Sequence, residues 1–402
     1  MKLLVVAPQP FFTPRGTPFS VYYRTQVTCA LGHEVDLLTY GQGADVEIPG
    51  CRVIRTPAFR IFGPVKIGPS MLKLFHDVFM VVWTIGLLAR HRYEVVHAHE
   101  EAVFWCRWLK PLFRFRLIHD MHSSLPQQLH NFQFTQLRAV HWAFERLETS
   151  AARAAEAVIT VCPALTDYAR GLTRNDDKVL LIENSLFDPV RFAGAGAREG
   201  SPGEAAADPT EAPAREWMST RMPGHVIAYA GTLEVYQGID RLLEAFAAVV
   251  RQIPDAGLLI VGGASREVER FRALADALGL GASVLFTGRL SQPAAQRLVR
   301  LAGVAVSPRF AGNNTPMKIY QLMADGIPLV ATRIESHTQV LNDDIAVLAT
   351  PDADGLARAI IEVLADPRSA QAMGERAKAW YQEKYSREVY TQKMRTMLSL
   401  VS

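Results

Sequence analysis

Short apolar runs alternate with longer amphipathic stretches along most of the chain. The runs read KLLVVAP, EVDLLTY, EVVHAH, RLIHDMH and AVITVCP in the first half, and HVIAYAGT, GLLIVGG, SVLFTG, VAVSP and PLVAT in the second. Stretches with helical apolar spacing, such as GIDRLLEAFAAVVRQI and REVERFRALADALGL, lie between them. Strands and helices that alternate in this way predict parallel sheets covered by helices on both faces. We therefore expect an α/β protein with two doubly wound, Rossmann-like domains.

A segment without apolar periodicity separates the two halves. Residues 193–217, AGAGAREGSPGEAAADPTEAPAREW, are rich in Gly, Ala, Pro and Glu, which is typical of a flexible, exposed connection. We expect an N-terminal domain at 1–192, this linker, and a second domain at 218–376. A C-terminal helix at 377–402 is expected to cross back to the first domain. The 402 residues suffice for two hydrophobic cores.

Composition and charge exclude several classes of protein. The formal net charge of +3 is too close to balance for bulk nucleic-acid binding. The cysteines are widely spaced, which predicts reduced thiols in a cytoplasmic protein rather than a disulfide or zinc framework. They are Cys29, Cys51, Cys106 and Cys162.

Two apolar segments have a composition similar to that of membrane-targeting signals. The start, MKLLVVAPQPF, has an apolar run too short for a signal peptide and is expected to be a first strand. Residues 77–90, DVFMVVWTIGLLAR, fall short of the roughly 20 residues needed to span a bilayer. We interpret this second segment as a buried core helix.

The stretch NNTPMKIYQLMADG at 313–326 predicts a helix that follows a polar loop. Thr315 is suited to the N-cap, Pro316 to the first helical position and Gly326 to the residue after the end. Lys318 then places a cation in the first turn, where the helix dipole favours an anion. A bound anion between them resolves this conflict. The alternative is that Lys318 is a solvated surface residue.

A second loop of the same kind opens the second domain. In AYAGTLEVYQGIDRLLEAF, a strand ends at a Gly231-Thr232 turn, and Gly238 precedes a helix. Arg309 follows another strand, a few residues before the helix that carries Lys318. Two strand-end loops with a guanidinium, an ammonium and a helix N-terminus are suited to hold a diphosphate. The alternative is that these glycines are ordinary turn residues.

These residues together resemble a known family. AGTLEVYQGIDRLLEAF, LLIVGG, VLFTGRL, VSPR and PMKIYQLMADGIPLVAT follow the order and spacing of the nucleotide-sugar-binding domain of retaining, family 4-like GT-B glycosyltransferases (glycosyl transferases group 1). PRGTPFSVYYRTQVTCALGHEVDLLT, VVHAHE, IHDMHSSLP and KVLLIENSLFDPVRF resemble that family's first domain. The resemblance implies two domains that face each other across a cleft, with a nucleotide-sugar donor and a glycan or lipid-linked acceptor as substrates. It implies no cofactor and no metal.

The resemblance also implies roles for individual residues. Gly16 would lie against the donor diphosphate, and His122 would face the donor sugar. Arg309 and Lys318 would face the leaving diphosphate. The remaining donor contacts would come from the second domain. They are Gly231, Thr232, Gln237, Gly288, Asn313, Asn314, Thr315, Pro316 and Gln321, with Gln321 near the ribose.

This chain departs from the family pattern at four charged positions. Thr232 and Gln237 stand where members usually carry an Arg and a Lys. Asn313 and Gln321 stand where many carry a pair of glutamates. The net charge is unchanged and the replacements still form hydrogen bonds, so binding is expected with altered selectivity. Loss of fixed cations bears more directly on catalysis, because they stabilise the developing phosphate charge. A catalytically silent relative that binds a nucleotide sugar or a partner protein is therefore an alternative, and a nucleotide-sugar 2-epimerase is another.

Two further patterns suggest a metal. His97, His99, His119 and His122 include alternate residues of one strand, which is compatible with a zinc site, although polar residues lining the cleft are the simpler interpretation. The DAD sequence at 352–354 is similar to a metal-binding motif but precedes a helical stretch, so we interpret it as an N-cap region.

Residues 104–116, FWCRWLKPLFRFR, mix aromatic and basic side chains. This mixture suits an interface with anionic lipid, and the alternative is that the aromatic rings pack into the core. The membrane interpretation implies a lipid-linked acceptor and a place at the inner face of the membrane for an otherwise cytoplasmic protein. The sequence does not identify the donor base, the sugar, the acceptor or the oligomeric state.

Overall fold

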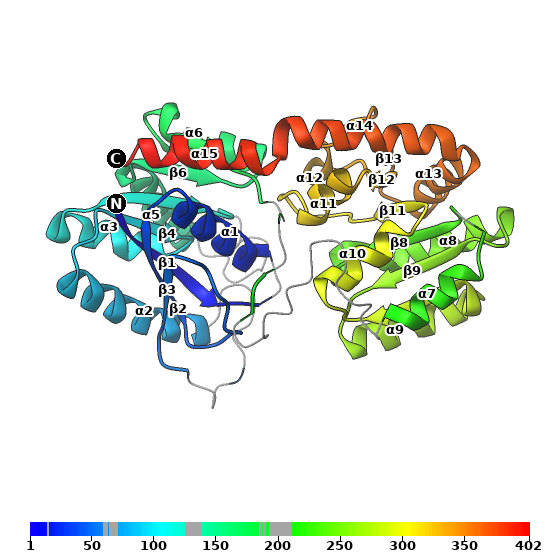
Figure 1. Ribbon diagram of the computed structural model, residues 1–402, viewed down its shortest axis with the longest axis horizontal. Coiled ribbons are helices and arrows are strands. Elements are labelled where there is room, and N and C mark those ends of the chain that lie inside the picture. The colour runs from blue at the N-terminus through cyan, green and yellow to red at the C-terminus, as the bar shows by residue number, and fades with distance from the viewer. Residues whose placement is uncertain are drawn as a thin grey trace. The chain divides into compact units, whose positions relative to one another are not determined.

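The computed structural model describes residues 1–13, 16–58, 63, 71–124, 138–184, 187, 190–192, 211–222 and 224–402. The chain divides into two compact units, Met1–Ala197 with Arg387–Ser402, and Arg198–Ser386 (Figure 1). Each unit contains a parallel sheet with helices packed against it. The predicted α/β class with two doubly wound domains is confirmed.

The sheet of the first unit has seven parallel strands in the order β3-β2-β1-β4-β5-β6-β7. They are β1 (Lys2–Pro10), β2 (Glu34–Tyr40), β3 (Cys51–Arg55), β4 (Val95–His99), β5 (Arg116–Met121), β6 (Ala157–Thr160) and β7 (Val179–Leu181). Its helices are α1 (Gly16–Ala30), α2 (Met71–Arg90), α3 (Ala102–Phe113), α5 (Arg138–Ala154), α6 (Pro163–Leu172) and α15 (Arg387–Ser399). The strand order reverses between β1 and β4, and doubly wound sheets bind ligands at the carboxyl ends of strands beside such a reversal.

The sheet of the second unit has six parallel strands in the order β10-β9-β8-β11-β12-β13. They are β8 (Val226–Ala230), β9 (Gly257–Val261), β10 (Val284–Gly288), β11 (Val304–Ser307), β12 (Leu329–Thr332) and β13 (Val347–Ala349). Its longer helices are α7 (Ala212–Ser219), α8 (Ile239–Gln252), α9 (Ser265–Ala277), α10 (Gln292–Arg300), α11 (Met317–Asp325), α13 (Ala353–Ala365) and α14 (Pro367–Tyr385). The reversal here lies between β8 and β11.

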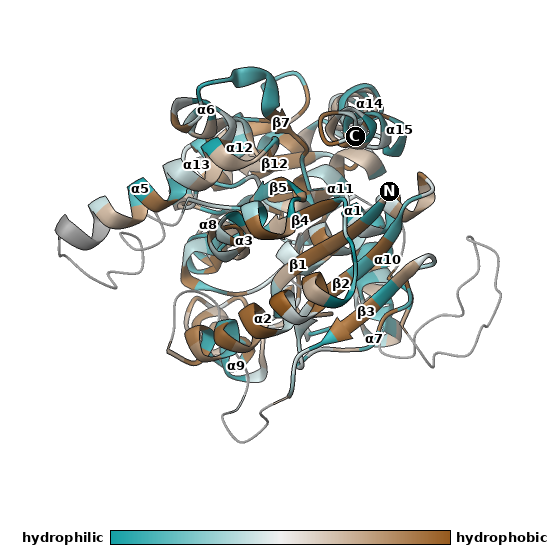
Figure 2. Cartoon of the chain, turned by 90° about the vertical axis from the view of Figure 1, so that its left-hand side faces the viewer, coloured by the Kyte–Doolittle hydropathy of each residue, from teal (hydrophilic) through white to brown (hydrophobic). Residues whose placement is uncertain are grey.

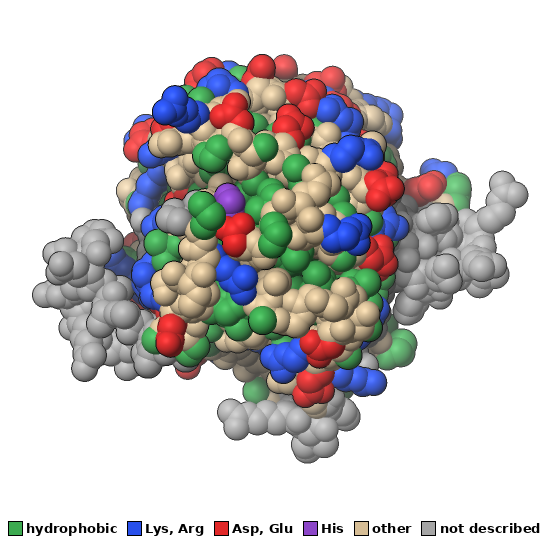
Figure 3. All heavy atoms as spheres, turned by 90° about the vertical axis from the view of Figure 1, so that its right-hand side faces the viewer, with side chains coloured by type: hydrophobic (Ala, Val, Ile, Leu, Met, Phe, Trp, Pro, Cys, Tyr) green, Lys and Arg blue, Asp and Glu red, His purple; other side chains and the backbone are tan. Residues whose placement is uncertain are grey.

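Alternate residues of β8 show why both faces of this sheet are covered. Ile227 and Tyr229 pack into one apolar cluster with α8, α9 and α13, whereas Val226 and Ala228 pack into clusters on the opposite face. Strands buried on both faces consist of nearly continuous apolar residues, as the sequence shows. On the outer surface of this unit, near α8 and α13, acidic and basic side chains are interspersed with apolar ones (Figure 3).

The segments around the predicted linker and the C-terminus differ from the sequence-based boundaries. Residues 193–210 lie outside the described residues, but residues 212–219 form α7, because helix-forming residues follow Pro213 and Met218 is buried. The C-terminal segment forms two helices, α14 and α15, which are separated at Ser386. Residues 387–402 belong to the first unit, where the Tyr390 ring packs on Phe187 at 5.1 Å between centroids.

The prediction of a buried core helix at residues 77–90 is wrong. Helix α2 begins at Met71 and has 20 residues. Its most apolar 18-residue window has a mean hydropathy of 1.6, and only 22% of that window is buried. By length and composition it is the one helix among the described residues that could cross a membrane. It is apolar along most of its length (Figure 2). Hydropathy located an apolar helix but could not show which of its faces packs on the sheet.

Candidate functional site

Two loops of the second unit meet at the strand-order reversal. The loop after β8 and the loop after β11 are joined by a hydrogen bond from Phe310 N to Tyr236 O of 3.1 Å. Gly238 has a φ of 71°, and a Cβ there would lie 2.3 Å from Pro308 O. Only glycine allows the two loops to approach this closely.

Two cations lie where these loops meet. The Lys318 Nζ lies 4.0 Å from the centroid of the Tyr229 ring, and the Arg309 guanidinium lies 5.0 Å from that of Tyr236. Arg309 is held by donating to Ala311 O at 2.6 Å and to Asn314 O at 3.0 Å. Burial, with a smaller contribution from Arg309, lowers the pKa of Lys318 to about 7. Two desolvated cations close together favour binding of an anion.

Three polar atoms around these loops are buried without a hydrogen-bond partner. They are Lys318 Nζ, Thr315 Oγ1 and Gln237 Oε1. Thr315 is not the N-cap that the sequence predicts. Helix α11 begins one residue later than expected, so its N-cap is Pro316 and no side chain caps its amides. The helix therefore begins with N–H groups that no side chain caps, and the unsatisfied Thr315 hydroxyl directly precedes its N-cap in the chain. This arrangement is suited to an anion. Gly326 ends the helix at φ 69°, as predicted.

Three glycines bring neighbouring strand ends close together. Gly262 N donates to Gly288 O at 2.8 Å, and a Cβ on Gly262 would lie 2.0 Å from Gly231 O. A Cβ on Gly231 would lie 3.7 Å from Lys318 Nζ. The ends of β8, β9 and β10 therefore form a continuous edge that leads from the cations to Gly288.

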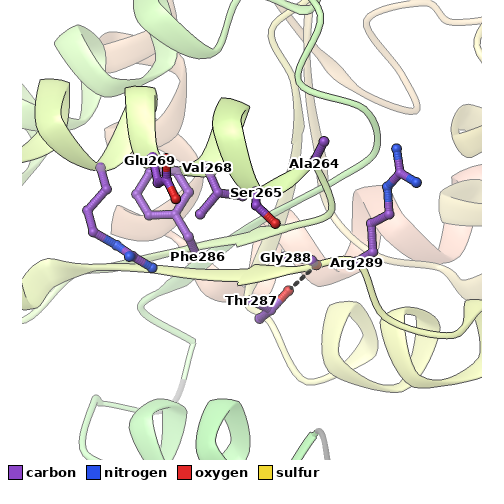
Figure 4. Close-up of a pocket in the computed structure, with 10 residues that line it drawn as sticks. Ala264, Ser265, Val268, Glu269, Phe286, Thr287, Gly288 and Arg289 are labelled. Atoms are coloured by element: carbon purple, nitrogen blue, oxygen red, sulfur yellow. Dashed lines mark hydrogen bonds between the residues drawn. The ribbon is translucent and has the colours of Figure 1, made fainter.

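A pocket of about 560 Å³ opens at the Gly288 end of this edge. Its walls come from the start of α9 and the end of β10 (Figure 4). The Phe286 ring and Val268 provide apolar surface, while Ser265, Glu269 and Arg272 provide polar groups. A flat ring with polar edges is the kind of ligand that such a lining accommodates.

The other predicted donor residues have the following positions. Thr232 Oγ1 donates to Glu234 at 3.0 Å, and Gln237 Nε2 is 3.5 Å from Thr232 Oγ1. Asn313 O accepts from Gln339 at 2.7 Å. Gln321 donates to Asp325 at 3.1 Å within α11. The side chains of Thr232 and Gln321 thus have protein partners in this structure.

The first unit contains a second buried cluster at its own strand-order reversal. His97 Nε2 lies 2.8 Å from Asp120 Oδ2, and His99 Nδ1 lies 3.2 Å from His122 Nε2. Arg24 NH1 donates to Asp120 Oδ1 at 2.6 Å, with both side chains fully buried. Burial lowers the pKa of His122 to about 4; the Asp120 charge opposes this shift, and the Arg24 charge adds to it. His122 is therefore a neutral imidazole at physiological pH.

The donor set in this cluster also meets the geometric requirement for a metal. His97, His99 and Asp120 offer ligand atoms within 4.8 Å of one another. Of the four histidines that the sequence suggested as a zinc site, His97 and His99 belong to this group, whereas His119 and His122 do not. Arg24 already binds the other oxygen of Asp120, so a second cation beside it would be repelled.

Arg24 is a residue that the sequence interpretation missed. It is the one charged residue in α1, and it is 1% exposed. A single charge within an otherwise uncharged helix is a signal that could have identified it. Gly16, predicted to contact the diphosphate, is the exposed first residue of the same helix. Gly16 and His122 belong to the first unit, while Arg309 and Lys318 belong to the second.

Comparison with known proteins identifies the family. Residues 219–380 match the family described as Glycosyl transferases group 1, and residues 26–185 match the Glycosyl transferase 4-like domain. A phosphatidyl-myo-inositol mannosyltransferase from Mycolicibacterium smegmatis is 24% identical over 91% of this chain and 85% of its own. A D-inositol 3-phosphate glycosyltransferase from Corynebacterium glutamicum is 26% identical over 86% and 82%.

Solved structures share the fold along the whole chain. Sucrose-phosphate synthase from Thermosynechococcus elongatus has a TM-score of 0.72 at 22% identity, covering 99% of this chain and 98% of its own. The Anabaena protein HepE, solved with UDP-glucose, has a TM-score of 0.70 at 17% identity and covers 99% of both chains. The chain therefore belongs to the group 1, family 4-like glycosyltransferases and has the GT-B fold.

Proposed function

We propose that this glycosyltransferase moves a sugar from a nucleotide-sugar donor to a hydroxyl group of a glycan or lipid-linked acceptor. The observation that carries the proposal is the buried Lys318 ammonium, which has no hydrogen-bond partner and lies beside Arg309 at the start of α11. A protein rarely keeps an unpaired charge in this position, and a diphosphate satisfies both cations and the free helix amides. The donor diphosphate is therefore assigned to this site.

The remainder of the donor fits along the edge formed by Gly231, Gly262 and Gly288. In this proposal the nucleobase occupies the pocket at Gly288, between Phe286 and the start of α9. Gln237 and Asn313 replace charged groups of the family pattern and bind sugar hydroxyls. Support comes from the solved relative that contains UDP-glucose.

The proposed reaction retains the anomeric configuration of a hexose, by displacement on the face from which the diphosphate leaves. Arg309, Lys318 and the amides of α11 stabilise the charge that develops on the leaving phosphate. That phosphate accepts the proton of the acceptor hydroxyl, so neither a protein base nor a metal is required. His122 is proposed to face the donor sugar, where a neutral imidazole can hydrogen-bond a hydroxyl without adding charge.

The acceptor is proposed to be lipid-linked, and the protein to work at the inner face of the membrane. Support comes from the names of two relatives, which act on phosphatidyl-myo-inositol and, in Arabidopsis thaliana, on phosphatidylinositol. The mixed aromatic and basic residues of α3 are consistent with this location.

Nucleotide titrations test the donor site. UDP and GDP should raise the melting temperature of the parent chain, and Lys318→Ala should weaken their binding at least about tenfold, because hydrogen bonds to charged groups contribute about 1.5–3 kcal/mol. Gln321→Ala is the matched control and should change the affinity less, since its side chain already bonds Asp325. Equal affinity of the Lys318 variant and the parent for these nucleotides would contradict the assignment of the diphosphate to this site.

Turnover assays then separate the alternatives. Release of nucleotide that depends on an acceptor supports the transferase. Nucleotide binding without turnover on a panel of lipid and glycan acceptors indicates the catalytically silent relative. Conversion of the donor sugar at C2 without any acceptor indicates the epimerase.

A further inference from the structure

Helix α2 exposes a continuous apolar stripe. Met71, Leu74, Val78, Val82 and Ile85 recur at helical spacing and are between 40% and 75% exposed, with Phe75 beside them at 38%. The stripe extends over roughly 20 Å at 1.5 Å per residue. The opposite face of the helix is buried through His76, Met80, Thr84 and Leu88. Because that face packs on the sheet, α2 is positioned to lie along a surface rather than to cross a bilayer.

Helix α3 packs against α2 and has exposed apolar residues of its own. Trp108 and Leu112, one turn apart, are 69% and 71% exposed. Tryptophan is enriched where a protein meets the boundary between lipid tails and headgroups. The exposed apolar residues of these two neighbouring helices are called the apolar face below.

A basic pocket lies at one end of this face. It has a volume of about 400 Å³ and is lined where α2 and α3 end, by residues 88–93 together with Phe113 and Arg114. Arg90, Arg92 and Arg114 are exposed, and among the described residues no carboxylate lines the pocket. Three guanidiniums around one hollow complement a phosphate group.

The distribution of charge around the apolar face differs from that on the outer surface of the second unit. There, acidic and basic side chains are interspersed among apolar ones (Figure 3). On α2 the single acidic residue, Asp77, is turned inward and accepts a hydrogen bond from Tyr40 at 2.5 Å, and α3 contains no acidic residue. The apolar face therefore has basic residues beside it without exposed acidic residues on the same helices, which favours an anionic bilayer over a protein of mixed charge.

We propose that α2 and α3 dock on an anionic phospholipid bilayer, with a headgroup phosphate held in the pocket of Arg90, Arg92 and Arg114. This pocket lies where α2 and α3 lead into β4 and β5, whereas His122 follows the carboxyl end of β5. The headgroup in the pocket is thus an anchor and not the glycosyl acceptor. This inference rests on the proposed function with a lipid-linked acceptor and adds how the protein would reach the membrane. Its test measures binding to vesicles and requires no turnover.

Vesicle flotation of the full chain tests the docking surface. The parent should bind vesicles of equimolar phosphatidylcholine and phosphatidylglycerol, and bind phosphatidylcholine vesicles more weakly. Val78→Asp/Val82→Asp should reduce binding at least about tenfold, because two charges replace apolar contacts with the membrane. Arg90→Ala/Arg92→Ala should reduce binding to the anionic vesicles by about fivefold for each arginine, and this loss should shrink as salt rises.

Matched controls use exposed residues of the second unit. Met222→Asp/Leu301→Asp and Arg251→Ala/Arg368→Ala alter similarly exposed side chains and should bind like the parent. Nucleotide-induced melting shifts should be unchanged in the Val78/Val82 and Arg90/Arg92 variants, so failure to dock is distinguishable from failure of the donor site. The proposal is overturned if the parent does not bind anionic vesicles, or if these two variants bind them as the parent does. It is equally overturned if inorganic phosphate stabilises the protein through Arg90 while vesicles do not bind.

Discussion

Replacing Lys318 with methionine should stabilise the second unit, and the gain should depend on pH. Burial and the nearby Arg309 lower the pKa of Lys318 from 10.5 to about 7. At 1.36 kcal/mol per pKa unit, holding this ammonium charged in the folded state costs about 5 kcal/mol. Methionine has a similar length and no charge to desolvate, so the variant avoids this cost.

The sign of the pH dependence follows from proton binding. Below pH 7 both the folded and the unfolded states of the parent carry the proton, so the full cost applies. Between pH 7 and 10.5 the unfolded state binds more protons, and the parent becomes more stable as pH rises. The stabilisation of Lys318→Met over the parent should therefore fall from about 5 kcal/mol at pH 6 to about 2 kcal/mol at pH 9.

Urea denaturation read by brief proteolysis measures this effect, because the surviving fragment identifies which unit is still folded. Lys378→Met is the control, since Lys378 is exposed on α14 and its replacement should stay within about 0.5 kcal/mol at both pH values. Adding UDP should stabilise the parent more than the Lys318 variant. A Lys318→Met variant no more stable than the parent, or equally stabilised at pH 6 and pH 9, would refute the claim that a costly buried ammonium is kept for an anion.

Two further substitutions test the supporting structure by the same assay. Arg24→Met should destabilise the first unit by about 3–5 kcal/mol, because it leaves the Asp120 carboxylate buried without its ion-pair partner. Arg24→Lys should recover part of this loss. A loss under about 1 kcal/mol for Arg24→Met would contradict the stabilising role of the ion pair. Gly238→Ala and Gly279→Ala both place alanine at φ 71°, but only the former brings a Cβ to 2.3 Å from a carbonyl oxygen. Gly279→Ala should therefore cost about 1 kcal/mol and Gly238→Ala clearly more, and equal costs would show that the loops separate easily.

The parts of the fold that the sequence predicted are those with strong local signals. Every apolar run interpreted as a strand corresponds to a strand of one of the two sheets, because buried parallel strands consist of nearly continuous apolar residues. The helix at 313–326 was found from its Pro316 and Gly326 signals, and Asp352 does act as an N-cap, accepting from Gly355 N at 2.7 Å. Strands β3, β7 and β13 were not anticipated. All three lie at an edge of their sheet and are only partly buried, so they lack the continuous apolar run that marks a central strand.

The parts that sequence could not supply depend on tertiary contacts. Whether the apolar residues of α2 face the sheet or the surroundings is decided by packing, which hydropathy does not record. Arg24 and Asp120 are 96 positions apart, so nothing local indicates that they form a buried pair. The site in the second unit was easier to predict from the sequence, because each of its two loops has its own signal in glycine, arginine or lysine near a strand end. That Lys318 is buried and unpaired follows only from the fold.

The positions at which this chain has neutral residues in place of the family's charged ones lie beside polar atoms that are buried without partners. Gln237 stands in place of a cation, yet its Oε1 is buried without a partner, as are Lys318 Nζ and Thr315 Oγ1. Each unsatisfied neutral atom costs about 1–3 kcal/mol, and the charged one costs more. Sequences that no longer bind a ligand lose such groups easily, because apolar replacements would be stabilising. Three costly atoms retained on the two meeting loops and the first turn of α11 therefore favour a site still in use, with Gln237 recognising a hydroxyl where relatives place a charge.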